Sequence, residues 1–202
     1  MIFIYRRKRR SGLLLPVLIG NTIGANAGAA VNADAAGMCF LFDTDASATI
    51  PSLLGGWTNV LTATNTTNIS MRVSCKVVTN GESVDPAGGS RARPRIYSNV
   101  DPTTPVSAGA AAGAGGNGNN ANVPSITMPG DRLVVGAIRR GGSGVPTWAT
   151  PLDQNVAAQN TTAVLTTAES AGVLGSYAGQ AVAIGSNNDW AAGAFAINGA
   201  PA

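Results

Sequence analysis

The nine residues Ile69-Ser70-Met71-Arg72-Val73-Ser74-Cys75-Lys76-Val77 decide the fold class, because apolar and polar side chains alternate along the whole stretch. Successive side chains of a β-strand point to opposite faces of its sheet. The alternation therefore predicts a half-buried antiparallel strand whose buried face carries Ile69, Met71, Val73, Cys75 and Val77.

Three further segments are typical of strands. Residues 38–42 and 133–138 are short apolar runs of the kind that is buried on both faces, and residues 191–197 form a small-residue strand near the C-terminus. No stretch has the pattern of a long amphipathic helix with capping residues. Residues 107–122 consist mainly of Gly, Ala and Asn, and we predict a loop there, since such a segment buries too little side chain to order itself unless something packs on it.

A weak internal duplication relates residues 37–100 to residues 130–198, with a spacing of about 95 residues. Each copy runs from a buried strand through Pro and Trp (Trp57 or Trp148) to an Asn-Thr-Thr turn and a second strand. Two related halves are what a double Greek-key sandwich contains. We therefore predict an all-β, antiparallel, jelly-roll-like β-sandwich at residues 35–202, with a core containing Phe40, Phe42, Met71, Val73, Val77, Leu133, Val135 and Phe195.

Residues 1–34 are predicted to be an extended N-terminal docking arm. Two apolar stretches flank a basic cluster, and they are too apolar to leave in water yet too short to form a core of their own. We expect the apolar stretches to dock on a neighbouring subunit through Ile2, Phe3, Ile4, Tyr5, Leu13, Leu14, Leu15, Val17, Leu18 and Ile19. The basic cluster, which would meet carboxylates of that subunit, consists of Arg6, Arg7, Lys8, Arg9 and Arg10.

Two other interpretations of the N-terminus stay open. A basic cluster followed by apolar and then small residues imitates a secretory signal, although apolar residues precede the charges and Pro16 interrupts the apolar run. Five consecutive cations are also enough for sequence-independent attraction to phosphate. The apolar run is far below the roughly 20 residues that span a bilayer, so we expect no membrane span.

The charge distribution argues against a nucleic-acid-binding body. The chain has 13 basic and 10 acidic residues, but residues 1–10 hold five of the basic ones, which leaves eight basic against ten acidic residues and a net charge of −2. The body is therefore not a phosphate-binding surface by net charge, and we expect no nucleic-acid partner.

Catalytic residue types are scarce. The chain has no histidine, which removes the Ser-His-Asp and Cys-His arrangements, and Cys39 and Cys75 lack the paired spacing of a zinc site. We predict buried free thiols, no metal, no cofactor and no enzymatic activity; carboxylate chemistry at Asp43 and Asp45 is the remaining enzymatic alternative. The sequence Arg91-Ala92-Arg93-Pro94-Arg95 is interpreted as a solvated loop, the alternative being a surface for one partner.

Several short motifs, spread over roughly residues 35–198, together resemble a β-sandwich module of phage-encoded virion proteins, such as minor tail, fibre and head-decoration proteins. The motifs are Ala36-Gly37, Gly56-Trp57-Thr58, the alternating strand at 71–78, Tyr97-Ser98-Asn99-Val100-Asp101-Pro102, Pro129-Gly130-Asp131-Arg132-Leu133-Val134-Val135 and Asn188-Asp189-Trp190-Ala191-Ala192. The N-terminal arm has no counterpart in that module, and the second copy has Thr147-Trp148 where Gly-Trp is expected.

The resemblance implies a structural protein located on the virion, with other virion proteins as partners and a homo-oligomeric state. The alternative is an adhesin that binds a host receptor or glycan. The tryptophans Trp57, Trp148 and Trp190 discriminate between the two, because buried rings favour the structural role and a solvent-facing ring beside Asp or Asn favours binding.

Overall fold

A computed structural model describes residues 13–20, 30–88, 91–140, 148, 153–159, 163–170 and 174–202. Every regular element in these residues is a β-strand, and every strand pair is antiparallel. The prediction of an all-β antiparallel sandwich is confirmed.

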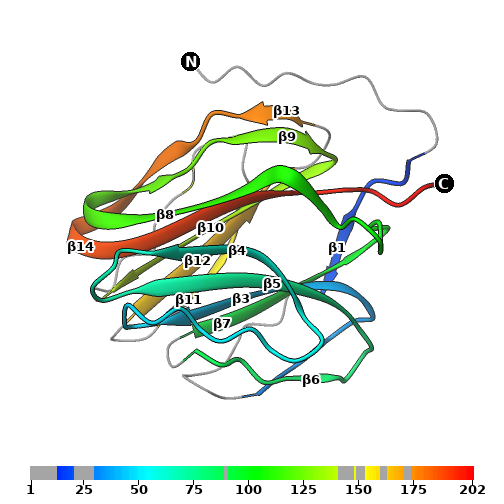
Figure 1. Ribbon diagram of the computed structural model, residues 1–202, viewed down its shortest axis with the longest axis horizontal. Helices are drawn as coiled ribbons and strands as arrows, with labels where there is room; N and C mark the ends of the chain where they lie inside the picture. Colours follow the sequence, from blue (N-terminus) through cyan, green and yellow to red (C-terminus); the bar gives the residue numbers. More distant parts are fainter. Residues whose placement is uncertain are drawn as a thin grey trace.

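Two five-stranded sheets form the body (Figure 1). Sheet 1 has the order β1 (Val17–Gly20), β7 (Arg91–Ser98), β3 (Gly37–Asp45), β5 (Ser70–Val78) and β4 (Thr58–Thr64). Sheet 2 has the order β11 (Asp153–Gln159), β12 (Ala163–Glu169), β10 (Arg132–Arg140), β14 (Gln180–Ile197) and β8 (Val106–Val123). Two small pairs complete the set, β9 (Ile126–Gly130) with β13 (Leu174–Tyr177) and β2 (Val31–Asn32) with β6 (Ser83–Val84).

The two sheets have corresponding strand orders. In sheet 1, β3 lies between β7 and β5, and β4 pairs with the far side of β5. In sheet 2, β10 lies between β14 and β12, and β11 pairs with the far side of β12. Because β3 and β10 begin the two sequence copies, this order is what a duplication requires. The duplication stays a prediction, and the matched order supports it.

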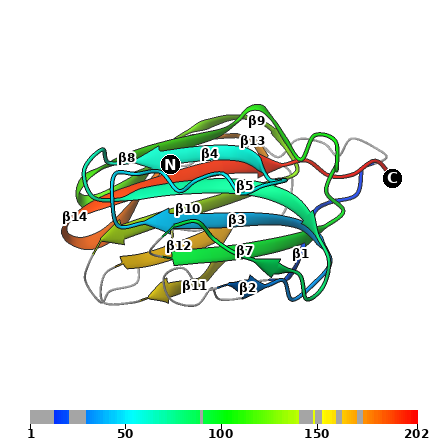
Figure 2. The same cartoon turned by 60° about the horizontal axis from the view of Figure 1, so that its bottom comes forward.

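Side chains from the facing sheets fill the central core. The buried residues there include Phe40, Phe42, Met71, Val73 and Phe195. Figure 1 shows β9 and β13 lying above sheet 2 and β6 below sheet 1, and Figure 2 shows β4, β5, β3 and β7 in sequence across sheet 1. Leu133 and Val135 are buried on the other face of β10, in a second core with Ile126 of β9 and Tyr177 of β13. Both apolar faces of sheet 2 are therefore covered.

Val77 is the one predicted core residue that the structure places at the surface. Its side chain is 58% exposed, whereas the neighbouring Val78 is buried in a small core beneath sheet 1 with Cys39 and Ile96. The face of β5 that was predicted to be buried is buried from Ile69 to Cys75, and Val77 at the end of the same face is exposed. The prediction of a half-buried strand is only partly right, because Ser70 and Ser74 on the opposite face are buried as well.

The predicted boundary of the sandwich at residue 35 is too late. Strand β1 pairs with β7 of the same chain, Leu13 forms an isolated bridge with Pro201, and the Leu14 N–H donates to the Ala200 carbonyl at 2.9 Å. Val31 and Ala33 are also buried in the body. Residues 13–20 and 30–34 are therefore parts of the folded body, and the predicted extended arm is wrong for these residues.

The predicted loop at 107–122 is wrong as well, because β8 is an 18-residue strand. Its order comes from pairing with β14 and from close packing on β4. A Cβ atom added at Gly113 or Gly115 would overlap the carbonyl oxygens of Thr62 or Thr64, respectively, so these glycines let two backbones meet at the corner between the sheets. A segment of this composition needs something to pack on it, and here β14 and β4 of the same chain do so.

Replacing Gly113 with Ala should lower the free energy of unfolding by about 1–3 kcal/mol, the usual cost of overpacking a closed contact. Urea-induced unfolding followed by tryptophan fluorescence measures the change. Gly55→Ala is the matched control, since an added Cβ there meets nothing within 4 Å and the backbone has an ordinary φ. Equal stabilities of the two variants would contradict the close contact between β8 and β4.

Candidate functional site

Three buried arginines alternate along β7. Arg91, Arg93 and Arg95 lie opposite Thr44, Phe42 and Phe40 of β3, respectively, so their side chains share the inner face of sheet 1. Their exposed fractions are 3%, 1% and 0%. The prediction of a solvated loop is wrong: the segment is a strand, and the alternation that carries the arginines places them between the two sheets.

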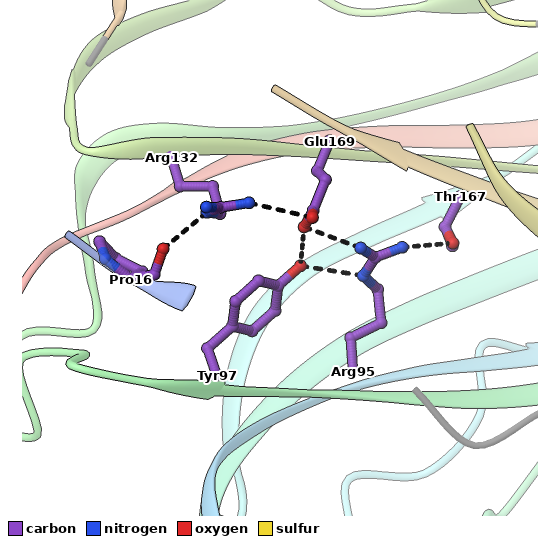
Figure 3. Close-up of polar contacts among 6 residues, drawn as sticks. All are labelled: Pro16, Arg95, Tyr97, Arg132, Thr167 and Glu169. Atoms are coloured by element: carbon purple, nitrogen blue, oxygen red, sulfur yellow. Dashed lines mark hydrogen bonds and ion pairs between the residues drawn. The ribbon is translucent and has the colours of Figure 1, made fainter. Parts of the chain in front are cut away.

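Arg95 lies at the centre of an ionic cluster that joins the sheets (Figure 3). Its Nη2 atom lies 2.8 Å from Oε2 of Glu169 on β12, and its Nη1 atom donates to the Thr167 hydroxyl at 2.8 Å. Its Nε atom donates to the Tyr97 hydroxyl at 2.9 Å, and that hydroxyl donates to Glu169 Oε2 at 2.7 Å. We call Arg95, Tyr97, Arg132, Thr167 and Glu169 the ionic cluster.

Arg132 extends the ionic cluster to the N-terminal segment. Its Nη1 atom lies 2.9 Å from Oε1 of Glu169, and its Nε atom donates to the Pro16 carbonyl at 2.8 Å. Glu169 therefore receives charged donors from β7 of sheet 1 and β10 of sheet 2. The same contacts fasten the residues just before β1 to the body.

Burial controls the electrostatics of this region. It raises the pKa of the Tyr97 hydroxyl well above its ordinary value, and the nearby Glu169 charge raises it further, so Tyr97 stays a neutral donor. Burial and the neighbouring charge of Arg95 lower the pKa of Arg93 to about 10, which leaves its guanidinium charged at neutral pH. A charged pair in such surroundings stabilises a fold only when its hydrogen bonds are satisfied. The ionic cluster meets this condition at Glu169, both of whose oxygens are bonded.

The tryptophans are mostly interior. Trp148 and Trp190 are each 5% exposed and belong to the core between sheet 2 and the β9–β13 pair. The indole nitrogen of Trp148 donates to the Thr166 hydroxyl at 2.9 Å, and the Trp190 ring lies against Gly116 of β8. Trp57 is partly buried against the small cores beneath sheet 1. Two of the three rings are thus buried.

Asp43 holds a loop on the outer face of sheet 1. Its Oδ2 accepts the Ala87 N–H at 2.8 Å, and its Oδ1 accepts the Gly88 N–H at 3.0 Å. Burial raises the pKa of Asp43 to about 6, although both backbone donors act in the opposite direction. Through these two hydrogen bonds, Asp43 holds the loop that contains Ala87 and Gly88 against sheet 1.

The raised pKa of Asp43 predicts a stability that falls as the pH rises. Between pH 4 and pH 6 the folded protein binds more protons at Asp43 than the unfolded chain does, so its free energy of unfolding should decrease across this window by about 2 kcal/mol. Asp43→Asn should remove this contribution while keeping an acceptor for the loop. Urea unfolding at several pH values measures the slope. Asp85→Asn, which removes an exposed carboxylate, should keep the wild-type slope; an unchanged slope in Asp43→Asn would contradict the assignment.

A polar cluster lies at the surface where sheet 1 meets the β8–β14 pair. Asp189 Oδ2 accepts the Asn68 amide at 2.7 Å, and its Oδ1 accepts the Asn117 amide at 3.0 Å. These two bonds, Asn117 first, hold the pKa of Asp189 below its usual range. The cluster ties the β4–β5 turn to β8.

The cysteines are free and buried, as predicted. Cys39 lies opposite Lys76 and Cys75 opposite Phe40, so the two thiols lie on opposite faces of sheet 1. Burial raises the pKa of both thiols, that of Cys75 to about 11, which keeps them protonated.

The predicted docking residues separate into three groups. Ile2, Phe3, Ile4, Tyr5 and the basic cluster Arg6, Arg7, Lys8, Arg9 and Arg10 lie outside the described residues. Leu18 packs on the central core, and Leu13 and Leu15 are partly buried. Val17 and Ile19, in the edge strand β1, and Leu14, whose N–H bonds to Ala200, are 44–46% exposed. Their docking on a partner stays a prediction.

Sequence reasoning missed Tyr97, Arg132 and Glu169 as members of one cluster. Glu169 lies 74 residues from Arg95 and reaches it only through the stacking of the sheets. One signal was available: Glu169 is one of two glutamates in the chain, and it directly follows a segment, residues 163–168, that contains only Ala, Val, Leu and Thr.

Among the residues that the structure describes, no group of three or more Cys, Asp or Glu side chains lies close enough to hold a metal ion. Nor does this part of the chain contain a helix long and apolar enough to cross a membrane. Comparison of the chain with protein-family models, with curated proteins and with solved structures finds no match.

Proposed function

We propose that this chain is a structural subunit of a bacteriophage particle, of the tail, fibre or capsid-decoration type, which acts through assembly and surface contacts. The resemblance of the short motifs to virion β-sandwich modules supports the phage assignment. The interior supports the structural role, because the buried charges of Arg95, Arg132 and Glu169 are bonded to one another across the two sheets.

The exposed edge of sheet 1 is the observation that carries the proposal. Strand β1 is the outermost strand of this sheet, and its residues Val17 and Ile19, together with Leu14 just before it, are each nearly half exposed. An edge strand offers unpaired backbone groups to another chain, and apolar side chains along it add area that is removed from water on contact. Such an edge suits a protein that is packed against others.

The positions of the tryptophans favour the same role over a binding protein. Trp148 and Trp190 are buried, so their rings are unavailable as stacking platforms for a sugar. The polar cluster of Asn68, Asn117 and Asp189 is the feature that would favour the adhesin alternative, since amides and carboxylates bind hydroxyl groups. A glycan array probed with the wild-type chain and with Asp189→Ala tests that alternative.

Particle labelling tests the structural role. Antibodies raised against the folded chain should decorate intact, purified particles of the phage that encodes it, at a repeated position seen by negative-stain electron microscopy. Digested purified particles should also contain its peptides by mass spectrometry. Particles that lack both the label and the peptides would contradict the proposal.

A further inference from the structure

We propose that strand β8 is an interface through which two copies of this chain pair edge to edge, antiparallel, about a twofold axis. A structural subunit acts by contact with other subunits, and the partner proposed here is a second copy of the chain; the inference therefore rests on the proposed structural function. Strand β8 is the outermost strand of sheet 2, and within the described residues it pairs with β14 alone. Its other edge, 18 residues long, is much longer than the four-residue β1 edge of sheet 1.

The central part of the open β8 edge, residues 111–118, lacks the usual protection against pairing, because the register shifts of the β8–β14 pair lie outside it. Folded proteins block edge strands with charged side chains, with proline or with a covering loop. Strand β8 contains no charged residue and no proline. Along it, Gly113, Gly115, Asn117 and Asn119 are exposed, so neighbouring parts of the described chain leave its surface accessible to solvent.

The central part of β8 is regular enough to template another strand. Residues 111–118 pair with β14 without interruption, and two glycines with positive φ lie near the ends of this stretch, Gly109 two residues before it and Gly118 as its last residue. We take the segment between these two glycines, residues 110–117, as the regular segment; its midpoint lies between Gly113 and Ala114. A twofold axis there would set Ala110 of one copy opposite Asn117 of the other.

A second copy is the occupant that this composition fits. Antiparallel pairing of β8 with itself sets small, uncharged residues opposite one another at every position of the regular segment, so no like charges meet and no large side chain obstructs the approach. The pairing would join two copies of sheet 2 into one ten-stranded sheet. The closed contact of β8 with β4 lies on the face toward which a Cβ at Gly113 or Gly115 would point, and side chains of a strand project perpendicular to the direction of its ladder hydrogen bonds.

Charge substitutions at two exposed positions test the axis. Ala108 and Asn119 are exposed, lie one residue beyond Gly109 and Gly118, and are equally far from the midpoint, so a register continued past these glycines sets Ala108 of one copy opposite Asn119 of the other. The double variant A108K/N119K places Lys opposite Lys twice and should weaken association about tenfold in Kd. The variant A108K/N119E places Lys opposite Glu and should associate at least as tightly as the wild type. The control S52K/N80K adds the same charge at exposed loop positions and should leave Kd unchanged.

The measurements are sedimentation equilibrium of the full chain over a range of concentrations and hydrogen exchange at the lowest and highest of them. Amides of an edge strand point alternately toward and away from its neighbour, so about half of the amides in residues 110–117 should gain protection as the concentration rises. A chain that is monomeric at every concentration overturns the inference. So does association that leaves residues 106–123 unprotected, or that A108K/N119K does not weaken.

These outcomes are separable from those of particle labelling. Labelled particles together with a monomeric chain would retain the structural role and refute β8 pairing. Concentration-dependent protection of β8 without labelled particles would retain the pairing and refute the role on the particle.

Discussion

Glu169→Gln should lower the free energy of unfolding by about 3–5 kcal/mol, the usual cost of removing one partner of a buried ion pair. Glutamine fills nearly the same volume but carries no charge. The Arg95 guanidinium, fully buried, would lose its carboxylate, and Arg132 would lose the same counter-ion. Urea unfolding at neutral pH, followed by the fluorescence of the three tryptophans, measures the loss.

Glu82→Gln is the matched control for this prediction. Its carboxylate lies 2.7 Å from the Lys76 ammonium, as short a contact as those in the ionic cluster, but both side chains are substantially exposed. Solvent screens such a pair, so its loss should be much smaller. If the two glutamine variants lose equal stability, the ionic cluster does not hold the sheets together.

The burial of the three arginines of β7 could not be predicted from the sequence. The alternation at residues 69–77 could be read because one face was apolar and the other polar. In β7 the alternating face carries Arg91, Arg93 and Arg95, and arginine is almost never fully buried without a partner. The partner, Glu169, belongs to the other sheet, and no local pattern connects residues 95 and 169. The alternation of Arg with other residues could have predicted a strand at β7, where a solvated loop was predicted instead. It does not show that the face carrying the arginines is the buried one.

Strand β8 was missed for the opposite reason. Its alanines, glycines and asparagines provide no contrast between faces, so periodicity carried no information, and glycine weakens strands by propensity. Pairing with β14 and the approach of the β4 backbone to Gly113 and Gly115 order the segment instead. Both contacts are long-range, which a single sequence does not reveal.

The apolar residues of the N-terminal segment were all predicted to dock on a neighbouring subunit, whereas part of the segment contacts its own chain. Val17–Gly20 is apolar because Leu18 packs on the chain's own core, while Val17 and Ile19 point outward at the sheet edge. A truncation that tests docking should therefore end at residue 12. Deleting residues 1–30 would also remove β1 and the Pro16 carbonyl that Arg132 binds, so a loss of assembly could then reflect a weakened fold.

Phe195→Ala should also lower the free energy of unfolding by about 3–5 kcal/mol, the typical cost of truncating a fully buried ring. Phe195 projects from β14 of sheet 2 into the central core. Its ring stacks on Phe40 at a centroid distance of 5.1 Å and lies 5.9 Å from Phe42, and all three rings are fully buried. Both partners belong to β3 of sheet 1, so this contact joins the centres of the two sheets.

Two further variants make the Phe195 test specific, with urea unfolding as the measurement. Val77→Ala removes apolar atoms from a side chain that is 58% exposed, and it should change stability little. Phe195→Leu keeps most of the buried volume and should cost less than Phe195→Ala, because the cavity left behind is smaller. If Phe195→Ala were no more damaging than Val77→Ala, the three phenylalanines could not lie in a closed core. The stacking of sheet 2 on sheet 1, on which both the ionic cluster and the outward edge of β8 depend, would then be wrong.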